Sequence, residues 1–340
     1  LPAETPGVGE RNVTQVFIDP YTGRYLGQRR ELDGLVGWAN QLHRAFGNNG
    51  PTVSLPSLGH LIAPSSYPEA SIRVGIGNLL IEMMAVWVLV LAASGIYLWW
   101  PRAMEKGKPR LAVRWGKGGR IRWRDLHATT GILLSVVLIC YIVSGLTWSR
   151  YWGENWRAVA STVTPSTEVD APSTPAKVGD LDRMGRRIAW ADKADPIYAS
   201  ATSDVTATPL GFNEIDQIAK SENMIPGYSI IGPSDSDEDG TPVYGSYTVV
   251  NHWPQKLSEQ RTLYLNQFTG QTIANATADQ DGALSRITSW GVNTHMGTQY
   301  GILTRILATL ACLGVLTSIV SAIAMWWKRR PTGSAGLPGR

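Results

Sequence analysis

Charged residues are scarce in this 340-residue chain: they make up 17% of it, against roughly 25% in ordinary soluble proteins. Cysteine is scarcer still, and its two residues, Cys140 and Cys312, lie inside apolar stretches where a small filler role is the simplest reading. No complete nucleotide-binding or flavin motif occurs. The segment Val74-Gly-Ile-Gly-Asn78 has only part of one, and it begins an apolar stretch instead of following a strand.

The sequence contains three long apolar stretches with almost no charged residues: 74–100, 128–148 and 306–327. Each is long enough to cross a bilayer core of about 30 Å as a helix. Tryptophan, at 14 residues, is plentiful, as expected of side chains that gather at membrane interfaces. Basic residues concentrate in 101–125 and at Lys328–Arg330, and the positive-inside rule explains them better than nucleic-acid binding does. The sequence therefore predicts an α+β integral membrane protein. Its expected partner is the lipid bilayer, and binding to nucleic acid is not expected.

This orientation divides the chain into seven units. They are a hairpin and amphipathic helix outside (1–73), a span (74–100), a basic cytoplasmic loop (101–127), a span (128–148), an outside α+β domain (149–285), an interfacial segment with the last span (286–330) and a cytoplasmic tail (331–340). Because residues 1–73 lie outside and no hydrophobic leader follows Leu1, either a signal peptide was removed or a further spanning helix precedes Leu1. We favour the helix, which would make four spans.

The outside units carry a repeated pattern. Alternating apolar residues around Asp19–Gly23 predict a strand, a turn and a strand, and 263–273 repeats that form. Helical spacing favours helices over 31–46 and 212–222, and strands are expected at 244–251 and 261–273. The stretches 47–71 and 161–176 read as a connection and a linker. The acidic run Asp235–Gly240 copies half of a calcium loop without its final Glu, so a solvated loop is expected.

Three of the five histidines lie at the edge of an apolar helix. His43 is on the apolar stripe of the 31–46 helix, His295 precedes the last span, and His127 is at the inner end of the second span. Neutral imidazole is a common axial ligand of haem iron. His43 and His295 lie at the same depth and can share one iron, whereas His127 is about 30 Å away. These positions predict two haems b, one near each membrane face; a C-x-x-C-H motif for covalent attachment is absent.

A glycine lies one helical turn from each of these histidines: Gly47, Gly131 and Gly291. Small residues there would let a backbone approach a flat macrocycle. The simpler alternative is that the histidines pack at helix interfaces, bonded to carbonyls or water. Zinc is disfavoured because no further Cys, His or carboxylate clusters around them. The second ligand of the inner haem would come from the helix expected before Leu1.

Four other side chains are candidates for supporting roles. Glu82 is the only acid inside a span, and it would either orient a histidine or relay a proton, or simply pair with a polar neighbour. His252 and Trp152 are candidate substrate contacts, although packing for His252 and a membrane-interface belt for Trp152 are the simpler explanations. His60, in a Pro-rich loop, is read as a surface or turn residue.

Seven short motifs distributed over most of the chain resemble one family. They are D-P-Y-T-G (Asp19–Gly23), L-H-R (Leu42–Arg44), S-G-I-Y-L-W-W-P-R (Ser94–Arg102), D-L-H-A-T-T-G (Asp125–Gly131), S-G-L-T-W (Ser144–Trp148), H-M-G (His295–Gly297) and M-W-W-K-R-R (Met325–Arg330). Together they resemble the PepSY-associated transmembrane family of bacterial inner-membrane proteins, and within it the haem-containing ferric-siderophore (ferrioxamine) reductase type. The resemblance implies PepSY-like periplasmic modules and reduction of ferric siderophores.

Taken with the histidines, the resemblance implies a reductase of the bacterial inner membrane that passes electrons through haem b to a periplasmic ferric siderophore and releases Fe(II). The inner loop, 101–125, is too short for a nucleotide or flavin domain, so electrons would come from a separate cytoplasmic or membrane donor. The alternative is a membrane-anchored PepSY binding or regulatory module in which the histidines are structural.

Overall fold

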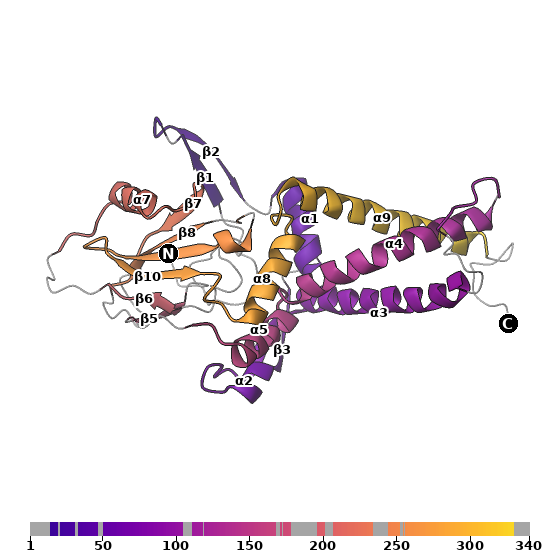
Figure 1. Ribbon diagram of the computed structural model, residues 1–340, viewed down its shortest axis with the longest axis horizontal. Coiled ribbons are helices and arrows are strands. Elements are labelled where there is room, and N and C mark those ends of the chain that lie inside the picture. Colours follow the sequence, from indigo (N-terminus) through magenta and orange to yellow (C-terminus); the bar gives the residue numbers. More distant parts are fainter. Residues whose placement is uncertain are drawn as a thin grey trace.

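A soluble part built of strands and short helices sits at one end of a bundle of long helices (Figure 1). The computed structural model describes residues 14–19, 21–30, 33–46, 50–104, 111–117, 119–167, 171, 173–177, 196–200, 207–233, 244–251, 254 and 256–329.

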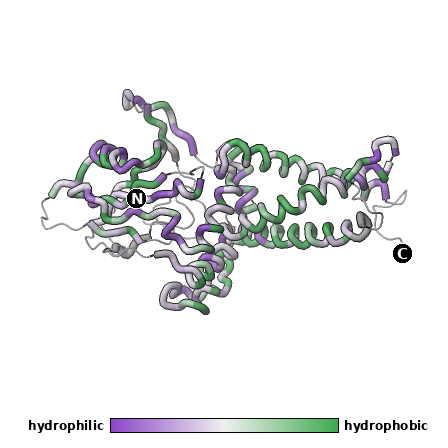
Figure 2. The backbone as a smooth tube through the Cα atoms, in the orientation of Figure 1, coloured by the Kyte–Doolittle hydropathy of each residue, from purple (hydrophilic) through white to green (hydrophobic). Residues whose placement is uncertain are grey.

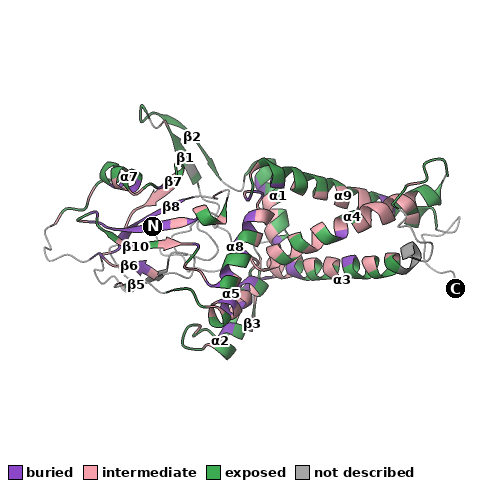
Figure 3. Ribbon diagram, viewed as in Figure 1, coloured by how far each residue is buried: buried purple, intermediate pink, exposed green. Residues whose placement is uncertain are grey.

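The bundle consists of three helices that are long and apolar enough to cross a membrane, counted over the described residues. They are α3 (Ile76–Met104, apolar over Ile76–Trp100), α4 (Arg120–Leu146) and α9 (Ile302–Trp327). Helix α4 packs against both α3 and α9. Figure 2 shows that most of their residues are hydrophobic, and Figure 3 shows that most of these residues are exposed or intermediate and few are buried. The predicted spans are confirmed as helices, and the chain is a multi-pass membrane protein.

The two ends of the bundle differ in charge. We call the end at Trp100, Arg120 and Trp327 the basic end, and the opposite end, which joins the soluble part, the module end. The basic end carries the described cations Arg114, Lys117, Arg120, Arg122, Arg124, Lys328 and Arg329. Helix α4 begins eight residues before the apolar stretch predicted from the sequence, because its first two turns are the basic segment around Asp125. Arg114 holds that carboxylate through two hydrogen bonds, of 2.7 and 2.9 Å.

The soluble part centres on a four-stranded antiparallel sheet in the order β10-β9-β8-β7. Its strands are β7 (Tyr228–Ile231), β8 (Ser246–Asn251), β9 (Arg261–Asn266) and β10 (Thr272–Thr277). The strand–turn–strand repeat expected at 263–273 is therefore present, as β9 and β10 joined by a tight turn. Strand β8 is buried at every position, because both faces of the sheet are covered.

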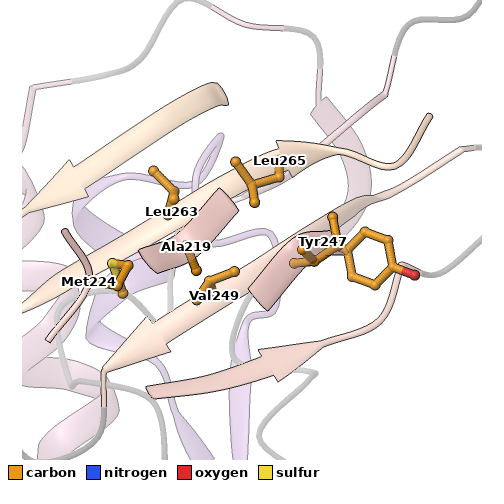
Figure 4. Close-up of a cluster of buried hydrophobic side chains, with 7 residues drawn as sticks. Ala219, Met224, Tyr247, Val249, Leu263 and Leu265 are labelled. Atoms are coloured by element: carbon orange, nitrogen blue, oxygen red, sulfur yellow. The ribbon is translucent and has the colours of Figure 1, made fainter. Parts of the chain in front are cut away.

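Helix α7 (Phe212–Ser221) covers one face of this sheet, and its predicted position is confirmed. Its buried residues pack with alternate side chains of β8 and β9 in a cluster shown in Figure 4: Ile215, Ala219, Met224, Tyr247, Val249, Leu263 and Leu265. The opposite face packs against β6 (Pro196–Tyr198), which pairs with β5 (Ser173–Lys177). Each fully buried Leu of the first cluster contributes about 1.5–3 kcal/mol to stability.

The predicted repeat is present down to its hydrogen bonds. In the hairpin of β1 (Thr14–Ile18) and β2 (Tyr25–Arg30), the Asp19 carboxylate accepts the backbone N–H groups two and three residues ahead, at 2.9 and 3.1 Å. In the β9–β10 hairpin, the Asn266 side-chain oxygen does the same at 2.9 and 3.1 Å. Each turn ends in a glycine with positive φ, Gly23 at 67° and Gly270 at 71°, a conformation that other residues rarely adopt. An aspartate or asparagine at the start and a glycine four residues later thus build the same turn twice.

Four helices form a collar at the module end. They are α1 (Gly34–Ala45), α2 (Leu58–Ile62), α5 (Tyr151–Val163) and α8 (Ala283–His295). Figure 1 shows α1 lying across the end of the spans and not along them. Helix α5 packs on α2 and α8, and Trp156 donates its indole N–H to the Thr288 hydroxyl at 2.8 Å.

The collar also contains the clearest departure from the sequence expectation. The stretch 47–71 was expected to be a plain connection, and this is wrong for its described part. It holds β3 (Thr52–Pro56) and α2, and β3 pairs with β4 (Ser71–Gly75), which leads directly into α3. The expected linker 161–176 likewise overlaps the end of α5 and the start of β5. The acidic run 235–240 lies outside the described residues.

Candidate functional site

Two histidines from opposite ends of the sequence meet at the module end. His43 is on α1 and His295 is the last residue of α8, and their ring centroids are 6.0 Å apart with the ring planes at 33°. The two helices are brought together because α1 packs on α3 while α8 packs on α4. The pairing expected from membrane depth is therefore the one that the fold makes.

His295 is held in a fixed orientation by α4. Its Nδ1 lies 2.8 Å from the backbone oxygen of Tyr141 and 3.4 Å from the hydroxyl oxygen of Ser144. A carbonyl oxygen can only accept, so Nδ1 carries the proton and donates it, which leaves a lone pair on Nε2. This is the usual arrangement of a metal-binding histidine, in which the second ring nitrogen is anchored by a carbonyl or carboxylate.

A glycine makes this close approach possible. A Cβ placed on Gly145 of α4 would lie 2.8 Å from Cε1 of His295, so no other residue fits there without moving the ring. Sequence reasoning missed Gly145, Tyr141 and Ser144 as partners of His295. The signal was present in the S-G-L-T-W motif, which pairs small residues on a span, but nothing in it names the histidine that they receive.

The surroundings of both histidines favour the neutral form of the ring by lowering its pKa. His43 as a whole residue is exposed, yet neighbours crowd its ring, and the resulting desolvation lowers its pKa, with the charge of Arg44 adding to the effect. Desolvation also lowers the pKa of His295; its bond to the Tyr141 carbonyl acts in the opposite direction, and His43 lowers it further. Neutral imidazole is the form that binds metals.

The separation of the two rings is compatible with a metal that both imidazoles would bind. Imidazole nitrogens bind transition metals at about 2.0–2.1 Å, so two such bonds plus the two ring radii separate the centroids by roughly 6 Å. In the described residues no group of three or more His, Cys, Asp or Glu side chains is arranged to hold a metal ion. Within the described residues the pair therefore offers two imidazole donors, fewer than the four ligands of a structural zinc site; haem iron stays a prediction.

His127 lies in a separate place, toward the basic end. It is 18 residues before Gly145 on α4 (145 − 127), which corresponds to about 27 Å along a helix. Its Nδ1 lies 3.1 Å from both the backbone oxygen of Ser318 and the hydroxyl of Ser321 on α9. This anchoring again leaves Nε2 with its lone pair. Of the described histidines, His127 alone lies toward this end.

His60 provides a comparison within the chain. Its Nδ1 also bonds a backbone oxygen, that of Tyr67, at 3.1 Å. It lies on α2, where its own backbone N–H is capped by Ser57, and no ring contact with another described histidine accompanies it. An anchored Nδ1 is therefore common to three histidines, and what distinguishes His295 is the second imidazole that faces it.

Glu82 is 2% exposed and serves the collar. Its carboxylate accepts the backbone N–H groups of Tyr151 at 2.9 Å and Trp152 at 3.3 Å, which are the first two residues of α5. A negative charge at that position also interacts favourably with the helix dipole. The geometry matches the polar pairing considered for this residue; a role in proton relay stays a prediction.

The remaining candidates are placed as follows. Gly131 of α4 has open space where a Cβ would point, whereas a Cβ on Gly291 would lie 3.3 Å from Cβ of Ser144, so Gly291 serves the contact between α8 and α4. Trp152 is 51% exposed on α5, beside the ring of Tyr151. Gly47 and His252 lie outside the described residues, and their predicted roles stay predictions.

Comparison with known proteins covers almost the whole chain. Residues 2–329 match the family described as the PepSY-associated TM region. The chain belongs to this family. A comparison with curated proteins found no match. Family membership agrees with the three spans and with the motifs that carried the resemblance, and it extends over both histidine-bearing collar helices.

Proposed function

We propose that this PepSY-associated protein is a b-type haem reductase of the bacterial inner membrane. It passes electrons across the bilayer to a ferric siderophore in the periplasm and releases Fe(II). The observation that carries the proposal is the facing pair His43 and His295, 6.0 Å apart at the module end. The module end would be periplasmic, because the cations of the basic end favour the cytoplasmic side.

The residues present divide the work between them. His43 and His295 would hold haem b at the module end, and His127 would supply one ligand of a second haem toward the basic end. The haems supply one-electron transfer, while the protein supplies ligation, orientation and insulation. The backbone oxygen of Tyr141 accepts the hydrogen bond from Nδ1–H of His295, which keeps Nε2 available. The backbone oxygen of Ser318 does the same for His127.

Two further parts of the proposal rest on arrangement alone. The substrate would approach from the soluble part, where Trp152 is exposed beside the collar. Electrons would enter at the basic end from a cytoplasmic or membrane donor. The second ligand of the inner haem would come from outside the described residues.

The test is spectroscopic, on the purified full-length protein, which must include the segment that supplies the second ligand of the inner haem. We expect a reduced haem band, with pyridine-haemochrome quantification giving two haems per polypeptide. His43→Ala and His295→Ala should each remove the same single haem, and His127→Ala should remove the other. His60→Ala is the matched control, since His60 has the same anchored Nδ1 without a facing imidazole, and it should retain both haems.

A colourless protein whose His43→Ala variant folds normally would overturn the proposal and favour a PepSY binding or regulatory module. If both haems are present, reduction of a ferric hydroxamate by the dithionite-reduced protein, followed as haem reoxidation and trapping of Fe(II) by ferrozine, tests the substrate. Failure of that step alone would leave a haem protein with another acceptor.

A further inference from the structure

Helix α1 has the reverse of the polarity expected at a protein surface. Leu35, Trp38 and Leu42 are spaced by three and four residues, so they form one stripe along the helix. These side chains are 79%, 57% and 37% exposed, respectively. A helix on the surface of a soluble protein normally turns such a stripe toward the core.

The opposite side of α1 is the one that contacts the protein. Gly37 is buried there, and Gln41 and Arg44, on the same side, are half-buried and engaged in interactions. Ala45, two turns after Trp38, is buried where the stripe ends. The backbone oxygen of Arg44 accepts the side-chain N–H of Asn78, at 3.0 Å, in the first turn of α3. Since the polar side is occupied by the protein, the apolar stripe points away from it.

The position of α1 in the fold indicates the surroundings of the apolar stripe. The helix crosses the end of the bundle at the module end and packs on the first turns of α3 (Figure 1). Those turns expose their own large apolar side chains, Leu80 at 40% and Met83 at 60%, on a helix that spans the membrane. The stripe of α1 therefore continues the lipid-facing surface of the bundle at the height where the spans begin.

We propose that α1 is an interfacial helix and that the Leu35–Trp38–Leu42 stripe lies in the lipid leaflet on the module side. Helices of this kind bury their apolar face about 5–10 Å into the boundary between headgroups and acyl chains. A tryptophan is at home at this depth, and α1 contains no acidic residue that the anionic headgroups would repel. The assignment does not depend on haem. It gives His43, the residue after Leu42, a depth set by the membrane as well as by contacts with protein.

Spin-label accessibility tests this placement in the full chain reconstituted in lipid nanodiscs. Cys140 and Cys312 are first replaced by serine, and single cysteines are then introduced at Leu35 and Leu42 and spin-labelled. Val90, 53% exposed in the middle of α3, gives the lipid reference, and Tyr21, 95% exposed at the tip of the β1–β2 hairpin, gives the water reference. Collision with oxygen reports lipid, and collision with a water-soluble nickel chelate reports solvent.

We expect Leu35 and Leu42 labels to favour oxygen over nickel, with a ratio between those of the two references and closer to that of Val90. A ratio equal to that of Tyr21 would place the stripe in water and overturn the proposal. Labels shielded from both reagents would also overturn it, because they would show that another polypeptide segment covers the stripe. A second measurement guards against misfolding. Leu35→Ser, introduced together with the labelled cysteine at position 42, should keep the gel-filtration profile and lower the ratio of oxygen to nickel accessibility of that label.

Discussion

At the scale of single residues, the site depends on how closely one histidine approaches a span. The ring of His295 rests on the backbone at Gly145, and its Nδ1 is bound to the Tyr141 carbonyl at 2.8 Å. The ring has little room to move. By contrast, His43 belongs to an exposed helix. The two members of the pair are therefore supported very differently.

We expect substitutions of Gly145 to displace His295. A Cβ at this position would lie 2.8 Å from the ring, so Gly145→Ala should shift it and Gly145→Val should displace it further. Overpacking of this kind costs about 1–3 kcal/mol. The measurements are haem retained per polypeptide and the melting temperature in detergent. Gly95→Ala and Gly95→Val are the controls, since nothing lies within 4 Å of an added Cβ there. Equal effects at the two glycines would contradict the contact.

Glu82 gives a second prediction at this scale. Glu82→Ala leaves the Tyr151 and Trp152 N–H groups without their acceptor, and we expect a loss of about 1–3 kcal/mol in stability. Glu82→Gln keeps a carbonyl acceptor and should lose less. Thermal unfolding checks the order of the variants, and the midpoint potential of the proposed haem should stay unchanged in both. A normal melting temperature with slowed haem reduction would instead support a proton relay.

At the scale of elements, α7 is attached to the sheet through Asp216. This carboxylate accepts hydrogen bonds from Lys220 on its own helix and from the hydroxyl of Tyr228 on β7, each at 2.5 Å. The bond from Lys220 lowers the pKa of Asp216 most, and Tyr228 lowers it further. Burial and the neighbouring carboxylate raise the pKa of Tyr228 to about 12, so the phenol stays protonated and donates.

This contact should be sensitive to acid. Because the pKa of Asp216 is lower in the folded state, its contribution is fully present above the unfolded value of about 3.9 and disappears as the pH falls through the folded value. The difference in melting temperature between the wild type and Asp216→Asn should be constant from pH 5 to 7 and shrink toward pH 3. Its size should be modest, below about 1 kcal/mol, since Lys220 is exposed. Asp279→Asn, at an exposed ion pair with Arg286, is the control for the loss of a surface carboxylate.

At the scale of the whole molecule, the orientation in the membrane can be tested directly. In a background without Cys140 and Cys312, a cysteine at Tyr21 should react with a membrane-impermeant maleimide in spheroplasts. A cysteine at Lys117, in the basic segment, should react only after the membrane is permeabilised. Reaction of both from the same side would contradict the opposite placement of the two ends.

The parts of this architecture that sequence patterns predicted are those with a strong local signal. Long apolar runs gave α3, α4 and α9, and an Asp or Asn followed by Gly four residues later gave both hairpin turns. The collar was missed between 47 and 71 because α2 is one short helix stabilised from afar: Leu58 donates its N–H to Asn155 of α5, 97 residues away. Similarly, helix spacing brought out His43 and His295 separately, but Gly145 is explained only by a contact between α4 and α8.

The unequal support of the two histidines has a consequence for how the molecule comes apart. The ring of His295 is held against the spanning helix α4. His43 lies on α1, which contacts the bundle through one side. On warming, α1 should detach from the spans before the bundle of spans loosens. Hydrogen–deuterium exchange should therefore show residues 34–45 exchanging faster than 285–295 well below the melting temperature. Simultaneous exchange of both segments would contradict this order of unfolding.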